Sequence, residues 1–238
     1  MINEAYNIDC VEYMKTMPDK YFDLAVVDPP YGHDCISWGG ERKYSRFNGM
    51  FDRYKRQIRR TGGSWSAKYA KKIIDWDVAP TDEYFKELFR VSKNKIIWGG
   101  NYFNLPPTRC FLIWRKTGVS EDFSLAMAEY AWTSFFSNAK VFECIPQGKA
   151  NDKRFHPTQK PIELYSWIYR LYAKKGDKIL DTHLGSGSSR IAAYFAGLDF
   201  YGCEIDKDYF DKSVERYERI CNDKIIVNGS EIKQLKLF

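Results

Sequence analysis

Residues 178–206 read "KILDTHLGSGSSRIAAYFAGLDFYGCEID", the pattern of a strand, a glycine-containing turn, a helix and a second strand. The strand ends at Asp181, and Gly185 and Gly187 lie in the turn that follows. Glycine tolerates left-handed backbone and lets a ligand approach the main chain. Glu204 lies at the tip of the second strand, where a nucleoside ribose receives hydrogen bonds in such units. The stretch therefore predicts an α/β unit that binds a nucleoside.

The glycine turn also distinguishes between cofactors. A nicotinamide dinucleotide site prefers three glycines, in the pattern GxGxxG, to hold a pyrophosphate. This turn has two glycines, with Ser188 or Ser189 near the third position. A cofactor with a ribose but no pyrophosphate fits better, and S-adenosylmethionine is such a molecule.

An alternation of strands and helices extends outward from this unit. Strands are expected at 5–9, 23–27, 94–100 and 110–114, and helices at 10–17, 81–92, from Thr158 to Gly176 with Pro161 in the first turn, and along the stripe Phe210, Val214, Tyr217 and Cys221. Residues 125–136 fit either a strand or a short helix. Alternating elements predict a mostly parallel sheet with helices on both faces.

The strand at 23–27 is followed by "DPPY" at 28–31. Proline has no N–H to donate to a sheet, so the strand must end at Asp28. A carboxylate, a turn of fixed φ and an aromatic ring therefore stand at the edge where open sheets bind ligands. The structural alternative is a turn that Asp28 caps and against which Tyr31 packs.

Positive charge is concentrated between Glu41 and Lys72, a segment with eleven Lys and Arg residues and two acidic residues. The surplus of nine exceeds the net +6 of the whole chain. Such a run can be a solvated face, but aromatic residues are interleaved with the cations, which suits phosphate contact and base stacking. We therefore expect DNA contacts from Arg42, Lys43, Arg46, Arg53, Lys55, Arg56, Arg59 and Arg60.

Length and composition exclude several classes of protein. At 238 residues and 44% hydrophobic content, the chain suits one large globular domain. It begins without the pattern of a signal peptide and has no apolar stretch of membrane-spanning length. The six cysteines form no CxxC pair, which indicates reduced thiols, no zinc site and a cytoplasmic protein.

Three motifs, "DPPY", "HPTQKP" at 156–161 and "DTHLGSGS" at 181–188, occur in that order. Together they resemble the amino-methylating DNA methyltransferases of the beta arrangement, most closely the small adenine-N6 members. The resemblance implies a Rossmann-like, S-adenosylmethionine-dependent methyltransferase fold with a seven-stranded, mostly parallel sheet and a circularly permuted motif order. It implies one methyltransferase domain over 1–238, with a basic DNA-contacting insertion at 33–75 and a short target-recognition region at 117–155.

The resemblance also implies roles for single residues. The catalytic loop would be Asp28, Pro29, Pro30 and Tyr31. The cofactor site would be Asp9, Cys10, Asp28, Thr158, Gln159, Lys160, Asp181, His183, Gly185, Ser186, Gly187, Glu204 and Ile205. Glu204 would hold the ribose and Asp9 would meet the adenine ring. Members often have Pro-Phe where this chain has Thr182 and His183, and the roles of His33, His156 and His183 stay open.

The activity implied is methyl transfer to the N6 amine of adenine in duplex DNA, with the target base rotated out of the helix. Cytosine N4 or an RNA base is the alternative acceptor, and an inactive DNA-binding relative is a third possibility. The sequence leaves a homodimer and a partner restriction nuclease open, and it gives no recognition site.

Overall fold

The computed structural model describes residues 1–32, 78–119, 126–146, 152, 154–221, 224–227 and 230–233. The chain divides into two compact units, one made of Met1–Pro29 and Thr81–Phe238 and the other of Pro30–Pro80. All the helices and strands named below belong to the first unit. The predicted basic insertion falls within the second, whose described ends come close together: a Cβ added to Gly32 would lie 2.7 Å from the Cβ of Ala79.

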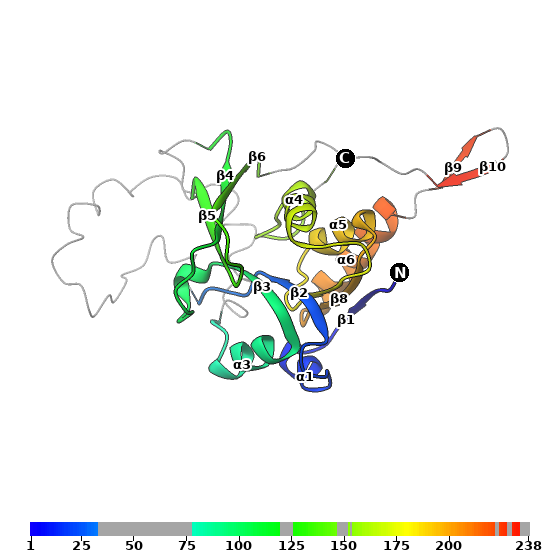
Figure 1. Cartoon of the computed structure of the whole chain (residues 1–238). Helices are drawn as coiled ribbons and strands as arrows, with labels where there is room; N and C mark the ends of the chain where they lie inside the picture. The colour runs from blue at the N-terminus through cyan, green and yellow to red at the C-terminus, as the bar shows by residue number, and fades with distance from the viewer. Residues whose placement is uncertain are drawn as a thin grey trace, which may run out of the picture. The chain divides into compact units, whose positions relative to one another are not determined.

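An eight-stranded sheet is the centre of the first unit (Figure 1). Its strands stand in the order β1 (Asn3–Tyr6), β8 (Asp199–Cys203), β7 (Lys178–Asp181), β2 (Phe22–Val27), β3 (Ser92–Trp98), β5 (Ala128–Thr133), β4 (Phe111–Lys116) and β6 (Lys140–Cys144). Strand β5 is antiparallel to β3 and β4, whereas the other neighbouring pairs are parallel. The mostly parallel sheet is confirmed, with one strand more than the seven expected. A separate antiparallel pair consists of β9 (Lys224–Val227) and β10 (Ser230–Lys233).

Helices cover both faces of the sheet (Figure 1). One face packs against α4 (Ile162–Tyr172), α5 (Ser188–Ala196) and α6 (Lys207–Cys221), and the other against α1 (Cys10–Lys15) and α3 (Asp82–Val91). Successive residues of β2 alternate between the two apolar clusters, with Leu24 and Val26 in one and Ala25 and Val27 in the other. A central strand buried on both faces needs a continuous apolar run, which explains the sequence of β2.

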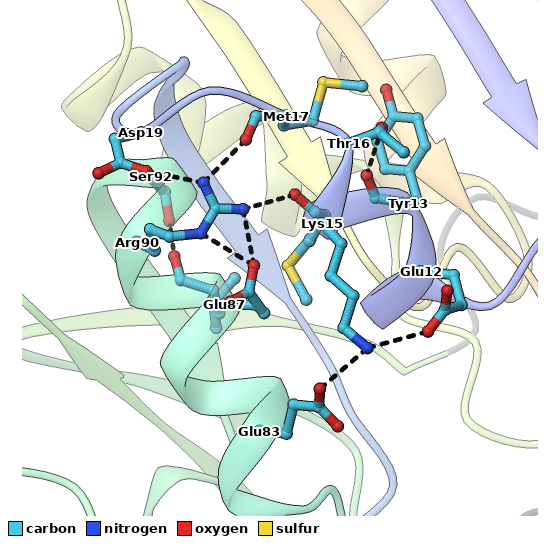
Figure 2. Close-up of polar contacts among 12 residues, drawn as sticks. Glu12, Tyr13, Lys15, Thr16, Met17, Asp19, Glu83, Glu87, Arg90 and Ser92 are labelled. Atoms are coloured by element: carbon cyan, nitrogen blue, oxygen red, sulfur yellow. Dashed lines mark hydrogen bonds and ion pairs between the residues drawn. The ribbon is translucent and has the colours of Figure 1, made fainter.

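Ion pairs and hydrogen bonds hold α3 to α1 and to the turn that follows α1 (Figure 2). Arg90 pairs with Glu87 and Asp19 and donates to the carbonyl oxygens of Met14 and Met17 at 2.8 Å. Lys15 lies 2.9 Å from Glu83. These contacts fix the helix that follows the second unit against the helix that follows β1.

Two expected elements have different bounds in the structure, and one open alternative is decided. Strand β1 ends at Tyr6, because Asp9 acts as N-cap of α1 and accepts hydrogen bonds from the backbone N–H of Val11 and Glu12. Helix α4 begins after Pro161, three residues beyond Thr158, and ends at Tyr172, before Gly176. The ambiguous residues 125–136 contain strand β5. No helix in the described part of the chain is long and apolar enough to span a membrane.

Candidate active site

Three carboxylates meet at one edge of the sheet. Asp28 follows β2, Asp181 ends β7 and Glu204 follows β8. These strands are parallel neighbours, so their carboxyl ends lie at the same edge. The sequence predicted all three positions. Burial raises the pKa of Asp181 to about 7, and the negative charges of Asp28 and Glu204 act in the same direction.

The glycine turn between β7 and α5 is fixed by Glu204. Gly185 and Gly187 have φ of +51° and +75°, the left-handed region that favours glycine. The backbone N–H of Gly185 donates to Oε2 of Glu204 at 2.7 Å, and that of Asp206 donates to Oε1 at 2.9 Å. Burial raises the pKa of Glu204. The acid expected to hold a ribose thus also sets the shape of the turn.

Thr182 and His183, which follow Asp181, contact Tyr84 of α3. The Tyr84 hydroxyl lies 2.7 Å from Oγ1 of Thr182, which in turn lies 2.9 Å from Nδ1 of His183. The rings of Tyr84 and His183 meet edge to face at 5.5 Å. Burial lowers the pKa of His183 to about 4, so the ring is neutral at physiological pH. A polar chain therefore links the first residues of the glycine turn to α3.

The end of β1 adjoins the end of β8. The side-chain amide of Asn7 donates to the carbonyl oxygens of Glu204 at 2.8 Å and Ile205 at 3.1 Å. The side chain of Ile205 is exposed, and Asp9 and Cys10 begin the next helix. These elements bring the residues expected around the cofactor's adenosine part to one place.

The "HPTQKP" segment packs onto the glycine turn. Ser188 Oγ donates to the carbonyl oxygen of Lys160 at 2.7 Å. A Cβ on Gly185 would lie 3.3 Å from the His156 ring, and that ring meets Tyr209 edge to face. The Gln159 side chain is buried and accepts a hydrogen bond from the backbone N–H of Phe155 at 3.3 Å. Oγ1 of Thr158 lies 3.2 Å from Nδ1 of His156.

Lys160 reaches across this edge into a chain of alternating charges. Its Nζ contacts Oδ2 of Asp28 and lies 3.1 Å from Glu129 of β5. Glu129 in turn lies 2.6 Å from Lys116, the last residue of β4. Burial opposes the charge on Glu129, but Lys160 and Lys116 outweigh it and lower the pKa of Glu129 to about 2. Glu129 is therefore ionised at neutral pH.

Arg216 of α6 donates hydrogen bonds to the glycine turn. Its Nη1 donates to the carbonyl oxygen of Ser186 at 2.7 Å and to Ser188 Oγ at 2.9 Å. Its Nε donates to Asp152 at 2.9 Å. Sequence reasoning missed Arg216, Glu129 and Lys116. A charged residue in the otherwise uncharged strand "AEYAWT" was the available signal for Glu129.

Some of the predicted site residues lie in the second unit or outside the described residues. Pro30 and Tyr31 belong to the second unit, whereas Asp28 and Pro29 belong to the first. His33 lies outside the described residues. So do the predicted DNA-contacting residues, which are Arg42, Lys43, Arg46, Arg53, Lys55, Arg56, Arg59 and Arg60. Within the described ranges, no group of three or more His, Cys, Asp or Glu residues could hold a metal ion.

Comparisons with known proteins fit this geometry. The model of the family N6_N4_Mtase, described as DNA methylase, matches residues 55–215. The type II methyltransferase M2.MboI of Moraxella bovis is 24% identical over 255 residues, covering 90% of this chain and 87% of that protein. Among solved structures, the cytosine-N4-specific PvuII DNA methyltransferase has a TM-score of 0.57 at 13% identity and covers 93% of this chain and 91% of its own. The complex of M1.HpyAVI with S-adenosylmethionine has a TM-score of 0.50 at 18% identity, covering 91% and 98%.

Proposed function

The chain belongs to the N6/N4 DNA methylase family, and on that premise we propose that it methylates the N6 amine of adenine in duplex DNA. The methyl donor is S-adenosylmethionine. One observation carries the proposal: a hydrogen-bond acceptor, Asp28, stands at the same sheet edge as a glycine turn flanked by Asp181 and Glu204.

The residues of this edge fit the cofactor. Gly185 and Gly187 give the turn its left-handed backbone, and Glu204 offers a buried carboxylate suited to ribose hydroxyls. Asp181 offers a second carboxylate for the amino group of the methionine part, and the exposed Ile205 offers an apolar surface for the adenine ring. S-adenosylmethionine supplies a methyl group made electrophilic by its sulfonium.

Asp28 is the proposed catalytic acceptor. The lone pair of an exocyclic amine is delocalised into its ring, which makes the amine a poor nucleophile. A carboxylate that accepts one amine hydrogen, and a proline carbonyl that accepts another, favour a tetrahedral nitrogen whose lone pair points at the methyl. The locked φ of Pro29 and Pro30 fixes the carbonyl direction. Tyr31 offers a face for the base that leaves the duplex.

Adenine is proposed over cytosine because of the sequence "DPPY", which resembles the adenine enzymes. Cytosine N4 is the second candidate, since the family includes both acceptors and the fold is shared with the PvuII enzyme. The expected cytoplasmic location, the target-recognition region at 117–155, the homodimer and the partner nuclease remain predictions.

Mass spectrometry of nucleosides tests the proposal. Duplex DNA from a methylation-free host is incubated with the protein and S-adenosylmethionine and is then digested. We expect N6-methyl-2′-deoxyadenosine from the wild type and none from Asp28→Asn, which keeps the size of the side chain but loses its charge. A methyl group found only in deoxycytidine would refute the adenine assignment. An active Asp28→Asn variant would refute the role of the carboxylate.

A further inference from the structure

We infer that Glu129 is a positioning residue for the proposed reaction: acting through Lys160, it holds the carboxylate of Asp28 in place at the end of β2. This inference rests on the proposed function and adds to it a residue remote in sequence from the three motifs. Glu129 lies on β5, the one antiparallel strand of the eight-stranded sheet.

The geometry brings three separate elements to one ammonium group. Lys160 precedes α4, Asp28 follows β2 and Glu129 lies on β5. The Lys160 side chain is only 3% exposed, against 13% for Asp28 and 23% for Glu129. Water screens such charges weakly, so their mutual attraction is larger than on an open surface. An ammonium group at this depth needs its carboxylate partners to remain charged.

Aromatic side chains of the described residues add to the surroundings of this charge cluster. The Trp98 ring of β3 lies 5.3 Å from Nζ and offers its face to the ammonium. Tyr165 of α4 is neutral, because burial, followed by the negative charges of Asp28 and Asp181, raises the pKa of its hydroxyl. Burial works against the charge on Lys160 itself, yet Asp28 and Glu129 together raise its pKa above the usual lysine range.

Glu129 therefore affects the contact between Lys160 and Asp28 through the protonation of Lys160. With Glu129 present, the ammonium is shared between two carboxylates, and Lys116 holds Glu129 from the far side at 2.6 Å. Without the Glu129 charge, Lys160 has one carboxylate instead of two to offset its burial. Its pKa must then fall, and above that pKa the contact that orients Asp28 weakens.

The variant Glu129→Gln tests this in the full-length protein, because it keeps the side-chain length and removes the charge. We expect kcat to fall by about 100-fold, the effect of displacing a catalytic group by roughly 1 Å. The dissociation constant of S-adenosylmethionine should not change. Between about pH 7 and pH 10, kcat of the variant should decline as Lys160 loses its proton, a decline that the wild type lacks.

Glu87→Gln is the matched control. The Glu87 side chain is 12% exposed and pairs with Arg90 at 2.6 Å on α3, so the same chemical change removes a comparable ion pair outside the site (Figure 2). This variant should keep the wild-type rate and pH profile. A purely structural loss would lower thermal stability in both variants without adding an alkaline decline in kcat.

The outcomes separate the inference from the proposed function. A wild type that transfers no methyl to DNA overturns the proposed function and the inference with it. An active wild type whose Glu129→Gln variant keeps the wild-type rate and pH profile overturns the inference alone. If Glu129→Gln fails to fold, carbon-13 NMR of lysine-labelled wild type decides, with the Lys160 signal assigned through Lys160→Arg. Titration above the ordinary lysine value of about 10.4 supports the inference, and titration at or below it overturns the inference.

Discussion

Replacing Arg216 by methionine should destabilise the protein more than any surface change. The Arg216 side chain is 2% exposed and donates to Ser186, Ser188 and Asp152. Among the ion pairs of the described residues, its removal leaves Asp152, itself 15% exposed, with Arg219 at 3.8 Å. Breaking a buried ion pair by removing one partner costs about 3–5 kcal/mol. Because Asp152 retains some contact with water, we expect a loss near the lower figure, about 3 kcal/mol.

Urea unfolding and thermal melting measure this loss. For a chain of this size, about 3 kcal/mol corresponds to a fall in Tm of roughly 6–12 °C. The affinity for S-adenosylmethionine should fall as well, since Arg216 holds the carbonyl of Ser186 in the glycine turn.

Arg219→Met is the control, because Arg219 meets the same carboxylate but is 51% exposed. An exposed pair contributes about 0–1 kcal/mol. The double variant Asp152→Asn/Arg216→Met should recover part of the loss, because the carboxylate left without its buried partner is gone. An Arg216→Met variant as stable as Arg219→Met would refute the reasoning.

Three further results are expected. Glu204→Ala should weaken S-adenosylmethionine binding by about 1.5–3 kcal/mol, measured by calorimetry. Asp28→Ala should leave that binding nearly intact. Equal losses in the two variants would contradict the separation of cofactor binding from catalysis. Burial raises the pKa of Asp181 to about 7, above its unfolded value of about 3.9, so the folded state binds more protons between those values. Relative to Asp181→Asn, the wild type's free energy of unfolding should therefore decrease from about pH 4 to about pH 7 in urea titrations of the cofactor-free protein, and a flat difference would refute this. Neutralising Arg56, Arg59 and Arg60 together should reduce the log–log salt dependence of DNA affinity by up to about three units if each contacts a phosphate; an unchanged slope would mean that they face solvent.

The sequence was sufficient to predict the site residues that directly follow parallel strands. Asp28, Asp181 and Glu204 each follow a short apolar run, and parallel strands place such positions at one edge. Their convergence could therefore be predicted without knowing the strand order. The two glycines of the turn were equally predictable, since both adopt positive φ.

The sequence could not predict the features that depend on pairing between strands distant in the chain. Strand β5 lies between β3 and β4 and antiparallel to both, although β4 precedes it in the chain, and no local pattern indicates that arrangement. The position of Glu129 beside Lys160 depends on it. On α6 the expected apolar stripe included Phe210 and Val214, but the buried positions are Tyr209, Ser213, Arg216, Tyr217 and Cys221. A partnered arginine can occupy a core position, which hydrophobic periodicity cannot detect.

The closeness of Gly32 and Ala79 has a consequence for how relatives of this protein can diverge. A Cβ on Gly32 would lie 2.7 Å from that of Ala79, so the chain leaves and returns at nearly the same point. The entropy of closing a loop depends only weakly on its length, and so a segment inserted at such a point can be lengthened, shortened or exchanged at small thermodynamic cost. The segment between Gly32 and Ala79 is therefore a suitable unit for exchange. Chimeras that join at positions 32 and 79 are the rational route to transplanting it between enzymes.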